Sequence, residues 1–279
     1  MAYKREGEVI VSRQNRRIVA LCKLSDRKAR EEAGLFRFDG IKLLCEALRR
    51  GVELDTVYLR TGSVEHVEER MTTLYGCALE DITCPIIEVD DGLFDKISEE
   101  NAPEGVITVA KYIDRFHKKY IIKKEADLTV PDGPVFLLDA VRDPGNVGAI
   151  IRSAAALGIR HMILSSDCAD LYHPRTLRAA MGPLFSMSIS RVDDLAAAVT
   201  LLRRGGRRVF AAALDDQAVR LGDVEFLSND CAVVGNEGHG ISPAVIEAAT
   251  QTLYIPMQAD TESLNASIAA ALVMWELCR

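Results

Sequence analysis

Long apolar runs are missing from this sequence of 279 residues. No stretch reaches the roughly eighteen uncharged apolar residues typical of a membrane-spanning helix, and the beginning, MAYKREGEVIVSRQ, lacks the apolar core of a secretory signal. The seven cysteines include no CxxC pair, which argues for reduced thiols rather than disulfides or a zinc site. His161 and His173 each stand alone, without the spacing of metal ligands. We expect a cytoplasmic protein with no membrane contact and no bound metal.

A dinucleotide-binding fingerprint is also missing. Such a fingerprint needs GxGxxG directly after a strand, with an acidic residue about twenty positions later. The string GNVGAI, which follows the apolar run beginning at Val135, contains only two of those glycines. The sequence therefore argues against a nucleotide-dependent dehydrogenase.

Basic charge is concentrated at the beginning of an otherwise acidic chain. The net charge is −7, but residues 1–50 hold thirteen Lys and Arg against seven Asp and Glu, so the rest carries −13. A basic segment of this kind suits RNA phosphates. The residues that we expect to meet RNA are Arg13, Arg16, Arg17, Lys23, Arg27, Lys28 and Arg30. The alternative is a solvated helix in which Glu31 and Glu32 are the local partners.

The length and the 48% hydrophobic content favour two domains. Behind the basic segment, the pattern predicts the alternating elements of a small α/β domain. These elements are a helix over residues 40–50, a strand over 56–59, a helix over 65–75, a strand over 86–89 and a strand-like stretch over 106–113. The lysine-rich stretch that follows is typical of a linker. We expect domains at residues 1–120 and 134–279, joined by a linker at residues 121–133.

The first motif whose residue types suit catalysis or ligand binding is LLDAVRDPGNVGAIIRSAAALGI. Its apolar run at Val135 to Leu138 predicts a strand, and the Asp-Pro-Gly that follows predicts a tight loop. The helical spacing of the apolar residues after that loop predicts a helix. Asn146 falls at the start of that helix and Arg152 inside it. The planar guanidinium of Arg152 suits a phosphate or carboxylate clamp. The alternative is a solvated arginine, or one paired with Asp143.

Two later motifs place polar groups after further strands. CAVVGNEGHGIS has an apolar strand at residues 231–234 and then three glycines around Glu237, which leave backbone N–H groups free for a ligand. IPMQADTESLNASIAAALVMWELCR ends in a small-residue helix from Ala266, with Ser263 and Asn265 just before it. Those two residues are either an ordinary helix cap or ligand-orienting groups at a helix N-terminus.

These three motifs, in this order and spacing, resemble those of the SpoU (TrmH) family of RNA 2′-O-ribose methyltransferases, in the SPOUT superfamily. The resemblance covers residues 134–279. It implies a parallel α/β domain with a trefoil knot, an exception to the rule that chains are unknotted. It also implies S-adenosyl-L-methionine as the cofactor, bound by Val234, Gly235, Asn236, Gly240, Ile255, Met257 and Leu264.

The same resemblance implies the catalytic residues, which are Asn146, Arg152, Glu237, Ser263 and Asn265. A ribose 2′-hydroxyl is a poor nucleophile until a base removes its proton, and the family role of Arg152 is that base. Free arginine is normally protonated, so the alternative is that Arg152 clamps the phosphate beside the target ribose. For His239, in the middle of GNEGHG, we expect no catalytic role.

The N-terminal region resembles the substrate-binding domain of SpoU relatives, which is shared with a group of small ribosomal RNA-binding proteins. The strings SDRKAR, LFRFDGIKLL and NAPEGVITV carry this resemblance. It implies an RNA substrate, with ribosomal RNA favoured and transfer RNA open, and the family implies a homodimer formed through the C-terminal domain. The expected function is S-adenosylmethionine-dependent methylation of a ribose 2′-hydroxyl in RNA. A non-catalytic RNA-binding protein is the alternative.

Overall fold

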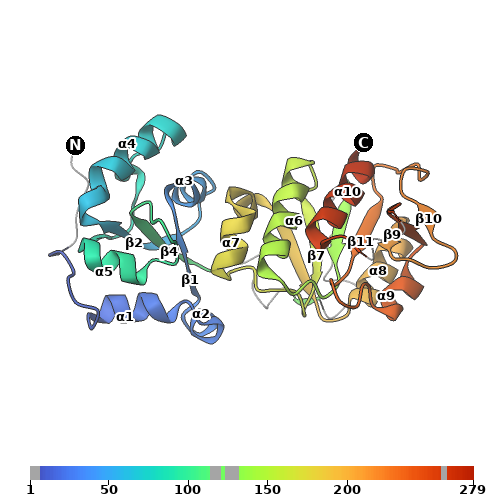
Figure 1. Cartoon of the computed structure of the whole chain (residues 1–279), viewed down its shortest axis with the longest axis horizontal. Coiled ribbons are helices and arrows are strands. Elements are labelled where there is room, and N and C mark those ends of the chain that lie inside the picture. The colour runs from blue at the N-terminus through green and yellow to red at the C-terminus, as the bar shows by residue number, and fades with distance from the viewer. Residues whose placement is uncertain (1–6, 114–120, 123–131, 259–262) are drawn as a thin grey trace. The chain divides into compact units, whose positions relative to one another are not determined.

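The computed structural model describes residues 7–113, 121–122, 132–258 and 263–279 (Figure 1). The chain divides into two compact units. Unit 1 comprises Met1–Ile113 and the segment Tyr172–Phe185, and unit 2 comprises Asp114–Leu171 and Ser186–Arg279. Most of the linker expected at residues 121–133 lies outside the described residues.

Unit 1 is built on a mixed sheet whose described strands have the order β1-β4-β2-β3. β4 is antiparallel to β1 and β2, and β2 is parallel to β3. The strands are β1 (Leu35–Asp39), β2 (Leu54–Arg60), β3 (Ile86–Val89) and β4 (Val106–Lys111). The helices are α1 (Arg16–Lys23), α2 (Arg27–Ala33), α3 (Ile41–Arg49), α4 (Val64–Tyr75), α5 (Asp91–Ile97) and α7 (Pro174–Ala180).

Helices cover both faces of this sheet, because successive strand residues point to opposite sides. Leu59 belongs to a core shared with α3 and α4, whereas its neighbour Tyr58 belongs to a core shared with α1 and α5 (Figure 1). α7 packs on the edge strand β1, where the ring centroids of Phe36 and Tyr172 are 4.6 Å apart. Unit 1 is therefore a small α/β layered structure.

The described strands of unit 2 form one parallel sheet in the order β10-β12-β9-β11-β6-β7-β8-β5. The strands are β5 (Ile121–Ile122), β6 (Val135–Leu138), β7 (His161–Ser165), β8 (Ser188–Val192), β9 (Val209–Ala212), β10 (Val219–Arg220), β11 (Cys231–Val234) and β12 (Gln251–Tyr254). The helices are α6 (Pro144–Ala156), α8 (Leu195–Arg204), α9 (Pro243–Ala248) and α10 (Ala266–Cys278).

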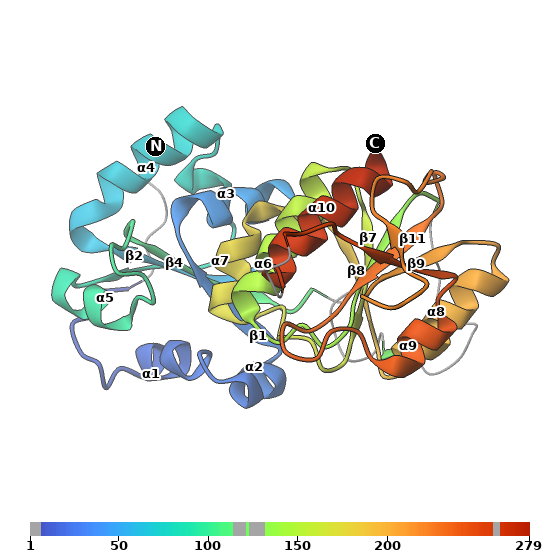
Figure 2. The same cartoon turned by 45° about the vertical axis from the view of Figure 1, so that its right-hand side comes forward.

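The sheet of unit 2 carries helices on both faces, which is why its central strands are apolar throughout. α8 and α9 pack on one face, in a core that includes Leu137, Val199 and Val245. α6 and α10 lie side by side and contact each other, and α10 also contacts β11 (Figures 1 and 2). Every residue of β6 and of β11 is buried.

β6 and β11 are neighbours, and their register pairs Leu138 with Val234 at the last position of each strand. The carboxyl ends of parallel strands meet at one edge of the sheet, where α/β proteins bind ligands. The turn that leads into α6 and the loop that follows β11 are therefore adjacent, although about ninety residues separate them in sequence.

Candidate active site

The turn after β6 places Asn146 in the first turn of α6. Asp143 caps the helix by accepting a hydrogen bond from the Asn146 backbone N–H at 2.9 Å, and Pro144 takes the first helical position. Arg152 lies six residues later, about 9 Å along the helix axis. Its side chain is exposed and forms no ion pair with any described residue, so the alternative pairing with Asp143 is not formed.

A chain of side-chain hydrogen bonds joins the three sequence motifs. Asn146 Nδ2 donates to Glu237 Oε1 in the loop after β11. Asn265 Nδ2 donates to Asn146 Oδ1 at 3.1 Å. Asn265 also caps α10, because its Oδ1 accepts from the Ser267 backbone N–H at 2.9 Å. Asn265 is thus both a helix cap and part of the polar cluster, and Glu237 contacts Asn146 rather than Arg152.

The loop after β11 is closed on itself. The backbones of Asn236 and Gly240 exchange two hydrogen bonds of 2.9 Å. Gly235 lies so close to this bridge that an added Cβ would be 2.2 Å from the Gly240 carbonyl carbon and oxygen. Gly240 has a φ of +68°, a left-handed conformation that glycine adopts without strain. Glycines at these two positions therefore let a short loop hold Glu237 opposite Asn146.

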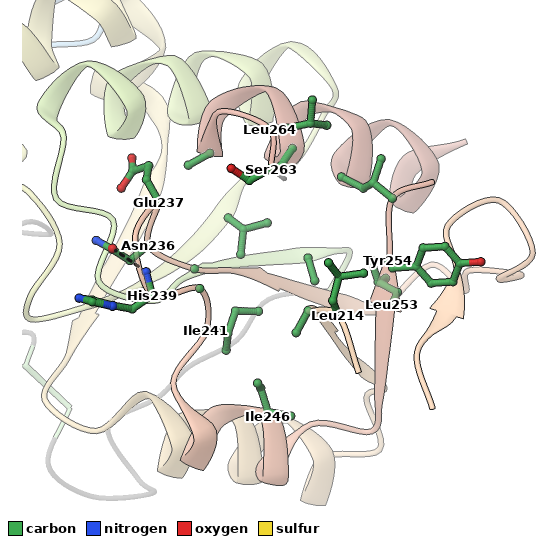
Figure 3. Close-up of a pocket in the computed structure, with 18 of the residues that line it drawn as sticks. Leu214, Asn236, Glu237, His239, Ile241, Ile246, Leu253, Tyr254, Ser263 and Leu264 are labelled. Carbon is green, nitrogen blue, oxygen red and sulfur yellow. Dashed lines mark hydrogen bonds between the residues drawn. The ribbon is translucent and has the colours of Figure 1, made fainter. Parts of the chain in front are cut away.

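A cavity of about 370 Å³ opens beside this loop (Figure 3). All seven residues expected to hold the cofactor line it: Val234, Gly235, Asn236, Gly240, Ile255, Met257 and Leu264. Glu237, His239 and Ser263 line it as well. In Figure 3, Asn236, Glu237 and His239 gather on one side of the cavity, and Leu214 and Leu253 lie on the other. This division suits a ligand with one polar end and one flat apolar part.

Part of the cavity wall was missed by the sequence analysis. Ala212, Ala213 and Leu214, at the end of β9, line the cavity, and the side chain of Leu214 is 72% exposed. The available signal was an apolar run over residues 209–214, which is followed by two aspartates. That signal marks a strand end, but it does not show that β9 pairs with β11.

Cysteine and metal chemistry are not offered by the described part of unit 2. Burial raises the pKa of the Cys231 thiol to about 11 and also raises the pKa of Cys168 and of Cys278, so none of the three is a thiolate at neutral pH. His161 begins β7, at the opposite edge of the sheet, and burial lowers its pKa to about 4. Within residues 7–113, 121–122, 132–258 and 263–279, no cluster of His, Cys, Asp or Glu is arranged to hold a metal. The same ranges contain no helix long and apolar enough to span a membrane.

The exposed side chains of the basic segment of unit 1 include some that also form ion pairs. Arg13, Arg16, Arg17 and Lys23 are exposed, at the start of α1 or along it. Arg27 pairs with Glu31 at 3.0 Å and Lys28 with Glu32 at 3.9 Å, the local partners considered in the alternative interpretation.

The expectation that Arg30 meets RNA is corrected by its environment. Its side chain is 1% exposed, and its guanidinium donates to the backbone oxygens of Leu24 and Ser25 at 2.8 and 2.9 Å. Arg30 satisfies carbonyl groups at the end of α1 and is not available to a phosphate.

Comparison with protein families matches both parts of the chain. Residues 133–275 match the SpoU rRNA Methylase family. Residues 15–108 match the MRM3-like substrate binding domain.

Among individual proteins, the chain is 29% identical over 269 residues to the 23S rRNA (guanosine(2553)-2′-O)-methyltransferase RlmP of Bacillus subtilis, covering 96% of this chain and 98% of the relative. It is 30% identical over 264 residues to the 23S rRNA (uridine(2479)-2′-O)-methyltransferase of Streptomyces viridochromogenes, covering 92% and 86%. Both similarities extend over the two units rather than over one.

Solved structures of methyltransferases are also similar to this chain over nearly its whole length. An AdoMet-bound rRNA methyltransferase from Sinorhizobium meliloti superimposes with a TM-score of 0.79 at 26% identity, covering 97% of each chain. The SpoU methyltransferase AviRb from Streptomyces viridochromogenes, in complex with AdoMet, superimposes with a TM-score of 0.78 at 26% identity, covering 95% of this chain and 97% of AviRb. The arrangement of α/β elements is therefore that of known methyltransferases.

Proposed function

Because this chain belongs to the SpoU rRNA methylase family, we propose that it transfers a methyl group from S-adenosyl-L-methionine to a ribose 2′-hydroxyl of RNA, with ribosomal RNA as the substrate. The observation that carries the proposal is the cavity of about 370 Å³ beside the Asn146–Glu237 hydrogen bond. This cavity has the size of the cofactor and lies next to the polar cluster at the ends of β6 and β11. The substrate class follows from the relatives, which act on 23S rRNA.

The residues around the cavity fit the cofactor. Leu214, Ile255 and Leu264 supply apolar surface for an adenine ring, and the closed loop around Gly235 presents backbone groups to a ribose. When bound, S-adenosyl-L-methionine supplies an electrophilic methyl group on a sulfonium. The polar side of the cavity, at Glu237 and Ser263, is where the methyl acceptor has to approach.

Asn146 and its neighbours orient the acceptor. Both ends of the Asn146 amide are engaged, by Glu237 and by Asn265, so its position is fixed before RNA binds. Such alignment supplies much of the rate in a group transfer between two bound molecules. The reaction forms the bond from the methyl carbon to the 2′-oxygen, breaks the bond from that carbon to sulfur, and passes the hydroxyl proton to a base or to water.

Arg152 is the residue that we assign to the RNA side of the reaction. Its exposed guanidinium forms no ion pair with a described residue and is free to meet a phosphate beside the target ribose. The alternative role as the base that takes the 2′-hydroxyl proton predicts a different pH dependence. With Arg152→Lys, a base role predicts activity that rises steeply towards pH 10, whereas a phosphate clamp predicts low activity at every pH.

Arg152→Ala tests the proposed function. We expect methyl transfer to fall at least about a hundredfold, while S-adenosyl-L-methionine still raises the melting temperature as in the wild type. Arg160→Ala, which removes an exposed arginine beyond the end of α6, is the control and should keep full activity. Equal loss of activity and cofactor binding in Arg152→Ala would show that Arg152 belongs to the cofactor site instead.

The remaining expectations complete the proposal. Residues 1–120 form an RNA-binding domain, and residues 134–279 form the knotted methyltransferase domain. The basic residues that the first domain presents to the substrate are Arg13, Arg16, Arg17, Lys23, Arg27 and Lys28. The protein works in the cytoplasm, where it meets ribosomal RNA, and it works as a homodimer. Support for the dimer comes from Ile268, Leu272 and Trp275 on α10, which are 53%, 42% and 57% exposed and recur at helical spacing on one face.

A further inference from the structure

Ala140, in the turn between β6 and α6, has a φ of +53°. An alanine rarely adopts this left-handed conformation, because its Cβ comes too close to the following carbonyl oxygen. Four residues later α6 begins, and with it the helix that carries Asn146 and Arg152. The direction in which α6 leaves the sheet therefore depends on a strained turn.

Two side chains hold this turn: one is at the end of β7, and the other is in the loop after β11, the two strands that flank β6. On one side, Ser165 at the end of β7 accepts a hydrogen bond from the Ala140 backbone N–H at 2.8 Å, and Ser165 is only 8% exposed. On the other side, Asn236 Nδ2 donates to the Ala140 carbonyl oxygen at 2.8 Å. Both polar groups of Ala140 are thus fixed by side chains rather than by the sheet.

Asn236 also fixes the loop that carries Glu237. Its Oδ1 accepts from the backbone N–H of Gly238 at 2.8 Å and of His239 at 3.3 Å. One amide therefore connects the α6 turn to the loop after β11, and the Asn146–Glu237 hydrogen bond spans these same two segments. The amide oxygen and one amide N–H of Asn236 are thus engaged inside the protein, although this residue was expected among the cofactor contacts.

We infer that Ser165 and Asn236 are positioning residues for methyl transfer: together they hold Ala140 in its left-handed conformation and so set Asn146 against Glu237. This inference rests on the proposed function. Neither residue touches the reacting atoms in this role, because each acts through the Ala140 peptide. A misplacement of α6 by a fraction of an ångström lowers the rate of a group transfer without removing any catalytic group.

The test compares Ser165→Ala and Asn236→Asp with the wild type. Asn236→Asp keeps the oxygen that accepts from Gly238 and His239 but loses the donor to Ala140. We expect each variant to lower kcat for methyl transfer by ~10- to 100-fold, with the Kd for S-adenosyl-L-methionine changed by less than about threefold. The double variant should lose less than the product of the two single losses, since both act on one peptide unit.

Asn229→Ala is the matched control. Asn229 also bridges two loops of unit 2, because its Oδ1 accepts from the Gly133 backbone N–H at 2.8 Å, but it does so before β6 and β11 begin. It should lower the melting temperature as much as the test variants and leave kcat unchanged. The inference is overturned if Ser165→Ala and Asn236→Asp keep the kcat of Asn229→Ala, or if their loss of rate is matched by loss of cofactor affinity. An inactive wild type would instead contradict the proposed function.

Discussion

Asn146 is held at both ends of its amide, by the Asn265 donor at 3.1 Å and by the Glu237 carboxylate. An asparagine that is bonded at both ends of its amide cannot exchange its oxygen and nitrogen by rotation without losing both bonds, so its donor and acceptor directions are defined. At the scale of single residues, the site is an arrangement of amides that prepares a surface for a ribose. In the proposed function, the charge that meets an RNA phosphate is that of Arg152.

Gly235 allows a prediction about one methyl group. In Gly235→Ala the new Cβ would lie 2.2 Å from the Gly240 carbonyl and 2.4 Å from the Ile241 nitrogen, all backbone atoms that cannot turn aside. The loop has to open, and we expect the affinity for S-adenosyl-L-methionine to fall at least about tenfold, or ~1.4 kcal/mol. Isothermal titration calorimetry measures this change.

Gly238→Ala is the control for that change. Its added Cβ would meet only the Asn236 side-chain oxygen, at 3.4 Å, which is ordinary van der Waals contact. Cofactor affinity should stay within about twofold of the wild type. An equal loss of cofactor affinity in the two variants would mean that the loop tolerates alanine at neither position. The Gly235–Gly240 contact would then have no special role.

His161 makes stability depend on pH. Burial lowers the pKa of His161 to about 4 from 6.5. Its contribution to the stability of the folded state is therefore present above pH 6.5 and is lost as the pH falls towards 4. With these pKa values, protonation of this residue alone lowers the free energy of unfolding by about 2 kcal/mol between pH 7.5 and pH 5. In His161→Leu that part of the acid sensitivity should disappear, as followed by urea unfolding at the two pH values. A difference between wild type and variant that is the same at both pH values would contradict this assignment.

At the scale of elements, strands and helices with a clear period could be predicted from the sequence. The apolar runs at Val135–Leu138 and Cys231–Val234 are strands with those bounds, because buried parallel strands are apolar throughout. The helix expected over residues 65–75 is α4 at Val64–Tyr75. The helix expected from Ala266 begins there and ends at Cys278.

Elements whose pattern is set by tertiary packing could not be predicted. β1 contains a buried arginine, Arg37, which pairs with Asp39 at 2.9 Å, so its run of residues lacks an ordinary strand pattern. The segment Tyr172–Phe185 belongs to unit 1 although the chain around it belongs to unit 2. Its Tyr172 packs on Phe36, a contact between residues far apart in sequence that no local period reveals.

In the candidate site, too, local features could be predicted from the sequence and contacts between distant segments could not. The residues of each motif could be found from glycines, caps and strand ends, since those signals are local. The contacts of Asn236 and Ser165 with Ala140 could not, because they join three strands that are distant in sequence. Arg30 was misassigned for a similar reason: its burial against the Leu24 and Ser25 carbonyls depends on how α1 and α2 meet.

α10 allows a prediction about assembly. Trp275→Glu places a charge in the exposed apolar stripe of Ile268, Leu272 and Trp275. If this stripe is the dimer interface, the variant should be monomeric at concentrations where the wild type is a dimer, as measured by sedimentation velocity. Leu74→Glu, at an equally exposed residue of α4, should leave the dimer intact. A wild type that is already monomeric would contradict the proposed homodimer.

At the scale of the whole molecule, an acidic chain has to bind RNA through a localised basic surface. The net charge of −7 opposes RNA binding in general, so under the proposed function the exposed basic residues of the α1 region act at short range. The proposed function accordingly has unit 1 capture the RNA and unit 2 transfer the methyl group.

The basic segment can be tested with paired double variants. Arg13→Gln with Arg16→Gln removes two exposed charges, and we expect weaker RNA binding with a salt dependence reduced by about two charges. Arg27→Gln with Lys28→Gln removes the same charge from side chains that already pair with Glu31 and Glu32, and should change the affinity less. Filter binding at several salt concentrations measures both. Equal effects of the two pairs would show that only total charge matters.

Methyl transfer to a ribose of RNA can be measured directly with the purified protein. Purified protein is incubated with radiolabelled S-adenosyl-L-methionine and separately with unmodified large-subunit rRNA, small-subunit rRNA and tRNA, and the labelled nucleotide is mapped. We predict label on a ribose 2′-oxygen of large-subunit rRNA, and none with Arg152→Ala. Label on a base, or no label on any of the three RNAs while RNA still binds, would contradict the account.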